Sequence, residues 1–236
     1  MTTRRFFALV WRANAIVLLL TAILACTVLA YGALQIYREA TRTRQATDIV
    51  NVAGEQIDRS TVELGQFERV EGFPVLRAPL RLQQQYGFSS GSKETTSIQN
   101  YLFYDPADGS ARWLVPRNTA LFLSTHELPD REYGRSDKAA AVVAVVYVMV
   151  ETDTDGDRRL TAADAKVLAV SSPAGMGFTR LLTGVVEANS VTLIGEKRIL
   201  ILYTTRKGLN AAEIDVDTRR VVRDAPPQVV KGEAGK

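Results

Sequence analysis

The strongest hydrophobic pattern along the chain is a single apolar run near the amino terminus. Residues 13–31 contain no charged side chain, and at 1.5 Å per residue about twenty helical residues span a hydrocarbon core of roughly 30 Å. Because backbone polar groups within lipid must be satisfied inside the segment, such a run must form a helix. The pattern predicts a transmembrane helix over residues 13–34, in contact with membrane lipid, after a cytoplasmic segment of residues 1–12.

After this run the pattern changes twice. Residues 35–59 are mostly polar and begin with good helix formers, which indicates a stalk that continues the helix. From residue 60 onward, short apolar or alternating stretches are separated by glycine, proline and aspartate, a pattern typical of strands and tight turns. The prediction is a mainly β fold over residues 60–223, built from meandering antiparallel hairpins in a propeller-like or sandwich arrangement. A disordered tail is expected over residues 224–236.

Two stretches give the clearest strand predictions. Residues 101–115 read YLFY, then a turn that contains Asp-Pro-Ala-Asp-Gly, then ARWLV, and this order predicts a hairpin. Residues 139–151 are mainly β-branched and small apolar residues, in a run too short to span a membrane and followed by acidic residues. We expect this run to form a buried central strand.

Similar strand–turn–strand segments begin near Tyr101, Val167 and Ala211, each with basic residues in its second strand. The segment VLAVSSPAGMGFTRLLTG in particular resembles the hairpin of TolB-type periplasmic β-propeller repeats. That resemblance implies a propeller-like fold, protein–protein contact as the usual role, and no catalytic residues. About 165 residues are available, whereas four or more blades need about 160 to 300. The resemblance therefore implies an incomplete propeller of three or four units, or a twisted sandwich.

The apolar run has two competing interpretations. A cleaved secretory signal would have an apolar core of about 7–15 residues, and this run is longer. Residues 23–26 are similar to a lipoprotein signal that would be lipidated at Cys26, although the residues after Cys26 remain apolar. Both interpretations stay open beside the retained helix. As the only cysteine of the chain, Cys26 excludes a disulfide framework and a thiolate zinc site.

The distribution of charge bears on partners and on orientation. The chain has a net charge of +3, whereas six arginines and one glutamate give its first 44 residues +5, so the remainder carries −2. The basic residues flank the apolar run, where they meet lipid headgroups, and this placement argues against nucleic acid as a partner. The short leading segment and the long following domain favour an inside amino terminus. We expect a signal-anchor in the inner (plasma) membrane, with the β domain in the periplasm.

Residues 153–164 form the most informative acidic stretch. A calcium loop needs hard oxygen ligands at alternating positions and a last carboxylate that closes the shell. Leu160 falls at the eighth position, the apolar position that holds such loops against a core. Numbered from the first aspartate, the spacing assigns as metal ligands the carboxylates of Asp153, Asp155, Asp157 and Asp164, the carbonyl of Arg159, and Thr161 directly or through water.

This frame resembles the calcium loop of EF-hand and dockerin proteins, and the resemblance implies calcium as a structural cofactor. The sequence departs from the pattern where Arg158 replaces the glycine of the sharp turn and where the closing residue is Asp164 instead of glutamate, and both changes weaken binding. Strands are expected on either side of the loop in place of helices. The competing interpretation is a solvated acidic turn in which Arg158 and Arg159 neutralise the carboxylates.

The sequence has no catalytic constellation that we recognise. It lacks a nucleophile elbow, a zinc-binding HExxH motif and a phosphate-binding loop, and its single histidine is His126. Carboxylates in one loop also differ from the pair that flanks a glycosidase cleft. We therefore expect a non-catalytic accessory or scaffold subunit of a membrane complex, with a membrane-protein partner. The alternative is an extracytoplasmic ligand-binding or sensing module, which an aromatic face with Tyr101, Tyr104 and Trp113 would favour.

Overall fold

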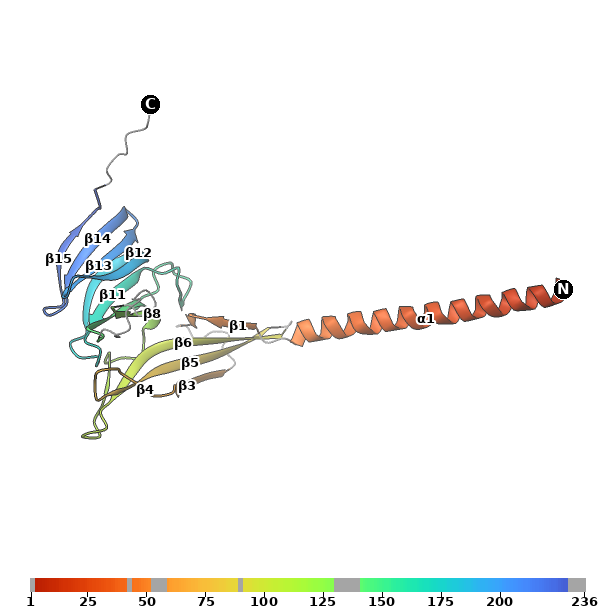
Figure 1. Ribbon diagram of the computed structural model, residues 1–236, viewed down its shortest axis with the longest axis horizontal. Helices are drawn as coiled ribbons and strands as arrows, with labels where there is room; N and C mark the ends of the chain where they lie inside the picture. Colours follow the sequence, from red (N-terminus) through yellow and green to blue (C-terminus); the bar gives the residue numbers. More distant parts are fainter. Residues whose placement is uncertain (1–2, 42–43, 52–58, 89–90, 130–140, 229–236) are drawn as a thin grey trace, which may run out of the picture. The chain divides into compact units, whose positions relative to one another are not determined.

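The computed structural model describes residues 3–41, 44–51, 59–88, 91–129 and 141–228. The chain divides into two compact units, residues 1–44 with 87–93 and residues 45–86 with 94–236. The first unit contains the long helix and the second contains most of the β structure (Figure 1). Each unit is described by itself below.

One continuous helix, α1 (Thr3–Thr41), forms the amino-terminal part of the chain (Figure 1). Its stretch Asn14–Tyr37 has a mean hydropathy of 2.4 and none of it is buried, so by length and composition it can cross a membrane or act as a signal sequence. The hydroxyl of Thr21 donates to the carbonyl of Val17 at 2.8 Å, which satisfies a polar side chain within the helix as a lipid environment requires. The predicted apolar helix is confirmed, and it extends beyond the predicted range of 13–34 at both ends.

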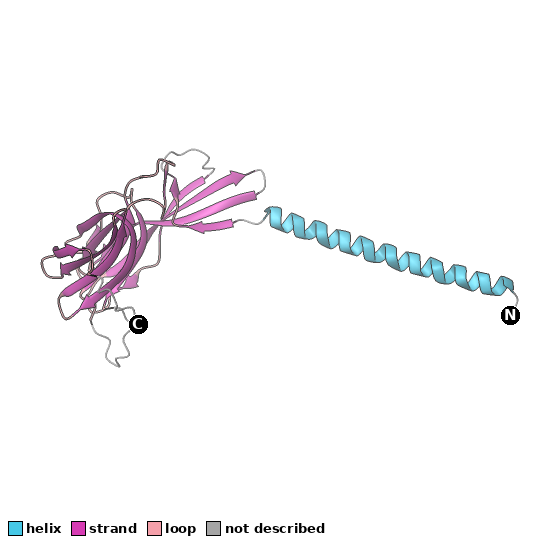
Figure 2. Cartoon of the chain, turned by 90° about the horizontal axis from the view of Figure 1, so that it is seen from above, coloured by secondary structure: helices cyan, strands magenta, loops and turns pink. Residues whose placement is uncertain are grey.

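The β structure is antiparallel and meandering, as predicted. The main sheet has 13 strands, and its longest path runs β15-β14-β13-β12-β11-β9-β8-β6-β5-β3, with β1 and β7 paired to β6 and β4 paired to β5. Strands are the predominant element of this part of the chain (Figure 2). The strands are β1 (Arg44–Thr47), β2 (Val50–Asn51), β3 (Arg59–Leu64), β4 (Glu68–Arg69), β5 (Leu76–Phe88), β6 (Gly91–Tyr104), β7 (Ala111–Trp113), β8 (Leu121–Leu128), β9 (Ala144–Val150), β10 (Arg159–Leu160), β11 (Lys166–Ser171), β12 (Thr179–Ile194), β13 (Arg198–Thr205), β14 (Gly208–Asp215) and β15 (Arg220–Ala225).

The two clearest strand predictions are confirmed. The predicted hairpin of residues 101–115 is formed by β6 and β7, with Tyr104 opposite Ala111 and with Gly109 in the left-handed conformation (φ 73°) that its turn requires. The predicted central strand is β9, whose residues are all buried. It lies between β8 and β11 in the sheet, so neighbouring strands satisfy its backbone on both sides.

Strand β9 contributes to two cores because its side chains alternate between the faces of the sheet. Val146 and Val148 belong to a cluster with Ile199 and Ile201 on one face. On the other face lies Tyr147, which is fully buried. The Tyr147 ring contacts aromatic rings on either side, with centroids 5.9 Å from Phe122, 6.1 Å from Tyr101 and 5.8 Å from Phe178.

The residues expected as a stalk, 35–59, take up several structures. Residues 35–41 continue α1, β1 pairs with β6, and β2 pairs with β10 in a second, two-stranded sheet. Residues 52–58 lie outside the described part of the chain. At the other end, β15 includes the first two residues of the expected tail, 224 and 225, and residues 229–236 again lie outside the described residues.

Candidate metal centre

The acidic loop lies between β9 and β11, so it joins two strands as expected. Its first carboxylate, that of Asp153, accepts the backbone N–H of Gly156 at 2.7 Å through Oδ1 and that of Arg158 at 2.7 Å through Oδ2. These two hydrogen bonds bend the backbone around the side chain. The backbone therefore has the curvature that several oxygens need to face one centre.

Arg158 occupies the sixth position of the loop, where the sharp turn falls. Its φ is 64°, a left-handed conformation that a residue with a Cβ adopts at a cost of roughly 1 kcal/mol or more. The hydrogen bond from its N–H to Asp153 helps to offset this cost. The loop thus makes the turn at the expected position although glycine is absent there.

Asp164, the last predicted ligand, is fully buried. One of its carboxylate oxygens accepts the N–H of Thr154 at 2.6 Å and the Thr154 hydroxyl at 3.1 Å, and the other accepts the N–H of Thr161 at 2.9 Å. Desolvation raises the pKa of Asp164, but the hydrogen bonds from Thr154 and Thr161 outweigh it, and the net pKa lies below the ordinary value. The carboxylate is therefore ionised and held in one orientation.

Three carboxylates converge. One oxygen from each of Asp153, Asp155 and Asp164 lies within 4.8 Å of the other two. Their proximity affects Asp155: the N–H of Asp157 lowers its pKa, but desolvation and the neighbouring charges of Asp157, Asp164 and Asp153 prevail and raise it above the ordinary value. Like charges gathered in this way repel one another, and a cation would relieve the repulsion.

The other three predicted ligands have different contacts. A carboxylate oxygen of Asp157 accepts the N–H of Arg159 at 2.8 Å, and the Thr161 hydroxyl accepts the N–H of Ala163 at 3.1 Å. Arg159 lies in β10 opposite Asn51. The structure therefore brings together three of the six predicted ligands, and the roles of Asp157, Arg159 and Thr161 stay predictions.

The apolar eighth position behaves as expected. Leu160 is 2% exposed and packs in a cluster with Val50, Leu82, Leu121 and Val150. Its strand, β10, pairs with β2, which places Leu160 opposite Val50. Burying a leucine contributes roughly 1.5–3 kcal/mol, so this contact holds the middle of the loop against the domain.

Two side chains hold the ends of the loop to the neighbouring strands, and sequence reasoning missed both. Arg180, on β12, donates from Nε to both carboxylate oxygens of Glu151 at 2.9 and 3.0 Å. The ammonium of Lys166, at the start of β11, donates to the carbonyls of Ala162 at 2.5 Å, Asp164 at 3.2 Å and Val186 at 2.7 Å. The contacts of Lys166 with Val186 and of Arg180 with Glu151 join segments that are distant in the sequence, and no local motif indicates them.

The donor set fits a hard divalent cation. Calcium takes six to eight oxygen ligands at about 2.3–2.6 Å, mainly carboxylates, carbonyls and water. The triad of Asp153, Asp155 and Asp164 provides carboxylate oxygens, and the loop carries further carbonyls and the Thr161 hydroxyl. Among the described residues, the group consists of three aspartates and includes no histidine nitrogen and no cysteine sulfur. A donor set made only of oxygens favours calcium or magnesium over zinc or copper.

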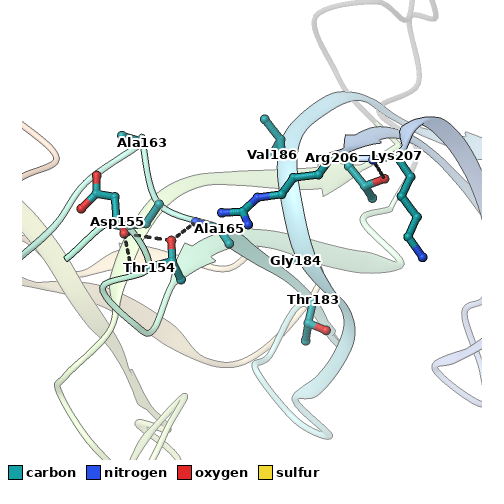
Figure 3. Close-up of a pocket in the computed structure, with 11 residues that line it drawn as sticks. Thr154, Asp155, Ala163, Ala165, Thr183, Gly184, Val186, Arg206 and Lys207 are labelled. Atoms are coloured by element: carbon teal, nitrogen blue, oxygen red, sulfur yellow. Dashed lines mark hydrogen bonds between the residues drawn. The ribbon is translucent and has the colours of Figure 1, made fainter.

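A groove of about 740 Å³ adjoins the loop (Figure 3). One side consists of loop residues, including Asp155 and Asp164, and the opposite side is the turn between β13 and β14 with Arg206 and Lys207. The groove therefore shares two carboxylates with the converging triad.

Comparisons with known proteins show little similarity. No family model matches the chain, and no curated protein matches it. Among solved structures, the chain is similar to the β-propeller domain of the Trilobed protease from Pyrococcus furiosus, described as having an open velcro topology. The two share 7% sequence identity with a TM-score of 0.33, over 69% of this chain and 42% of that one.

Proposed function

We propose that this chain is a non-catalytic, single-pass protein of the inner membrane whose β domain lies in the periplasm and serves as an accessory or scaffold subunit of a membrane complex. In this proposal calcium, bound at the acidic loop, stabilises the β domain. The observation that carries the proposal is the combination of an apolar helical stretch with no buried residue, Asn14–Tyr37, and a β domain in which one acidic loop gathers three carboxylates.

The helix supports the membrane part of the proposal. Leu18, Leu24 and Leu29 are 64%, 65% and 72% exposed. An apolar surface of this extent is unfavourable in water and stable in lipid. The β domain follows the helix in the chain, and long following domains are translocated largely regardless of flanking charge. This rule supports a periplasmic β domain.

The positions of three aromatic residues argue against the aromatic ligand-binding face that the alternative function would use. Tyr101 is 7% exposed and packs with its ring centroid 5.4 Å from that of Phe122. Trp113 is 41% exposed and lies opposite Leu102, on the same side of the hairpin as Tyr104. Because alternate residues of β6 face opposite sides, the three rings belong to two different faces.

The proposed complex can be tested by purifying the full chain, tagged at its carboxyl terminus, from native membranes in mild detergent. We expect a partner in stoichiometric amount. A matched control replaces α1 with an unrelated single transmembrane helix of equal length; retention of the partner would show that the β domain makes the contact. A lone monomer from the native chain would overturn the accessory role.

The placement in the membrane has its own test. In spheroplasts an external protease is expected to cleave the carboxyl-terminal tag while cytoplasmic markers stay intact. Mass spectrometry of the purified chain is expected to find an intact amino terminus and an unmodified Cys26. Protection of the tag would contradict the orientation, and a diacylglyceryl group on Cys26 would replace the transmembrane anchor with a lipid anchor.

A further inference from the structure

The groove beside the acidic loop is a concave surface that the proposed scaffold role does not use. Its volume of about 740 Å³ lies within the range of small-molecule and peptide sites. It is lined by Thr154, Asp155, Ala163, Asp164, Ala165, Thr183, Gly184, Val186, Thr205, Arg206 and Lys207. None of these residues is aromatic. Strand β12 contributes the floor of the groove with Thr183, Gly184 and Val186, whose side chains are small or absent.

Irregularities in β12 coincide with the floor of the groove. The register of β12 shifts against β11 between Lys166 and Leu168, and it shifts against β13 between Val185 and Glu187. Gly184 lies at this point with a φ of 68°, and a Cβ added to it would meet nothing within 4 Å. Bulges of this kind redirect side chains and often adjoin binding sites. The open space above Gly184 therefore belongs to the groove, at a point where β12 is irregular.

The turn on the far side is ordered by its own hydrogen bonds. The Thr205 hydroxyl accepts the N–H of Lys207 at 3.1 Å and donates to the carbonyl of Gly208 at 3.2 Å. The amide of Asn210 also donates to the Gly208 carbonyl, at 3.1 Å. The side chain of Arg206 makes none of these hydrogen bonds.

The two cations of this turn point in different directions. Figure 3 shows the Arg206 side chain extended past Val186 toward Ala165 and the acidic loop, whereas the Lys207 side chain points away from the loop. Both residues are exposed. Within the described part of the chain, the ion pairs involve other residues and none joins a carboxylate to Arg206. Its planar guanidinium is thus available to an anion that enters the groove.

The composition of the groove favours a carboxylate over a phosphate. A single guanidinium matches the two oxygens of a carboxylate in a fork-like pair. A dianionic phosphate calls for several cations or a cluster of backbone N–H groups, and it would be repelled more strongly by Asp155 and Asp164. Walls formed by Ala163, Ala165 and Val186 suit small aliphatic groups, and the hydroxyl of Thr183 offers a partner for an amide.

We propose that this groove binds a short peptide-like ligand by its free carboxylate, which pairs with Arg206. Because Asp155 and Asp164 belong both to the groove and to the converging triad, a cation on the triad lowers the negative charge beside the ligand. Calcium and the peptide carboxylate then favour each other's binding. Only this coupling rests on the proposed function; the carboxylate pairing with Arg206 does not.

The test uses the full chain in detergent and two probes that differ at one group, acetyl-alanyl-alanine and its carboxyl-terminal amide. Calorimetric titration is expected to show saturable binding of the acid and at least about tenfold weaker binding of the amide. Arg206→Gln is expected to weaken binding of the acid by about tenfold or more. Arg117→Gln, at an exposed arginine outside the groove, is the matched control and is expected to change it by less than twofold.

The outcomes separate the groove from the metal. Any one of three results would overturn the proposed carboxylate site. These are no saturable binding of the acid, equal binding of acid and amide, and an unchanged affinity in the Arg206→Gln variant. With the groove intact, affinity for the acid is expected to rise severalfold in calcium over chelator. If calcium stabilises the chain but the affinity for the acid is the same in calcium and in chelator, the proposed coupling is wrong and the carboxylate site still stands. If calcium does not stabilise the chain at all, the comparison of acid with amide still tests the carboxylate site.

Discussion

Two acidic turns of the β domain, residues 105–110 between β6 and β7 and residues 151–165 between β9 and β11, use their carboxylates differently. In the first turn Asp105 accepts the N–H of Ala107 at 2.9 Å and Asp108 accepts that of Ser110 at 2.8 Å. Each carboxylate serves its own stretch of backbone. In the second turn the carboxylates also accept backbone N–H groups, but oxygens of three aspartates come within 4.8 Å of one another.

The electrostatics of the two turns differ accordingly. Hydrogen bonds from the side chain and backbone of Ser110 hold the pKa of Asp108 below its ordinary value. The pKa of Asp155 is raised, because desolvation and the charges of Asp157, Asp164 and Asp153 outweigh the hydrogen bond from the Asp157 N–H. Aspartates in a turn are therefore a weak sign of a metal site, whereas convergence of their oxygens and mutual repulsion are a stronger one.

The largest expected difference between the two turns concerns Asp164. Asp164→Ala removes the acceptor of two backbone N–H groups and one hydroxyl in a buried site, so we expect a loss of about 3 kcal/mol in the free energy of unfolding. Asp108→Ala, in the exposed turn, is the matched control and is expected to change stability little. Urea unfolding in chelator measures both, and similar losses in the two variants would contradict the distinction.

Lys166 is a second difference between the two turns. Its ammonium donates to three carbonyls at the longer turn, and among the described residues no lysine does this at residues 105–110. Lys166→Met keeps the aliphatic stem and removes three hydrogen bonds, so we expect a loss of about 1–2 kcal/mol and a weaker response to calcium. Lys207→Met serves as the control at an exposed lysine. If unfolding in urea distinguishes the two variants by less than experimental error, the contacts of Lys166 do not hold the loop.

Most of the fold is predictable from the chain because its signals are local. The apolar helix and the hairpins follow from hydropathy and turn residues within single segments. Strands β1 and β2 are not predictable in this way: they are too short to show a period, and β2 pairs with β10, far along the chain.

The site is predictable to a similar degree. Spacing identifies Asp153, Asp155 and Asp164, which converge, but it also includes Asp157, whose carboxylate accepts the N–H of Arg159. Lys166 and Arg180, which hold the loop, escape sequence reasoning because their contacts with Val186 and Glu151 arise only when distant strands pair.

A smaller effect concerns pH. A raised carboxyl pKa means that ionised Asp155 destabilises the fold, and that this cost vanishes as the pH falls through the raised pKa. A lowered pKa means that ionised Asp108 stabilises the fold, and that this gain is lost below its ordinary pKa. In chelator, the difference in melting temperature between the native chain and Asp155→Asn should therefore shrink from pH 7 to pH 4. A difference that stays constant would show that the Asp155 carboxylate is not under repulsion.

The most direct test of the calcium-stabilised loop is the sign of the change that Asp155→Asn makes to the melting temperature. The full chain in detergent is melted at pH 7 in millimolar calcium and in chelator, beside Asp108→Asn as the control. A hundredfold excess of calcium over its Kd would stabilise the native chain by about 2.7 kcal/mol. We predict that Asp155→Asn melts above the native chain in chelator, where it relieves repulsion, and below it in calcium, where it removes a ligand. A change of the same sign in both conditions would contradict the account. So would a native chain whose melting temperature is the same in calcium and in chelator.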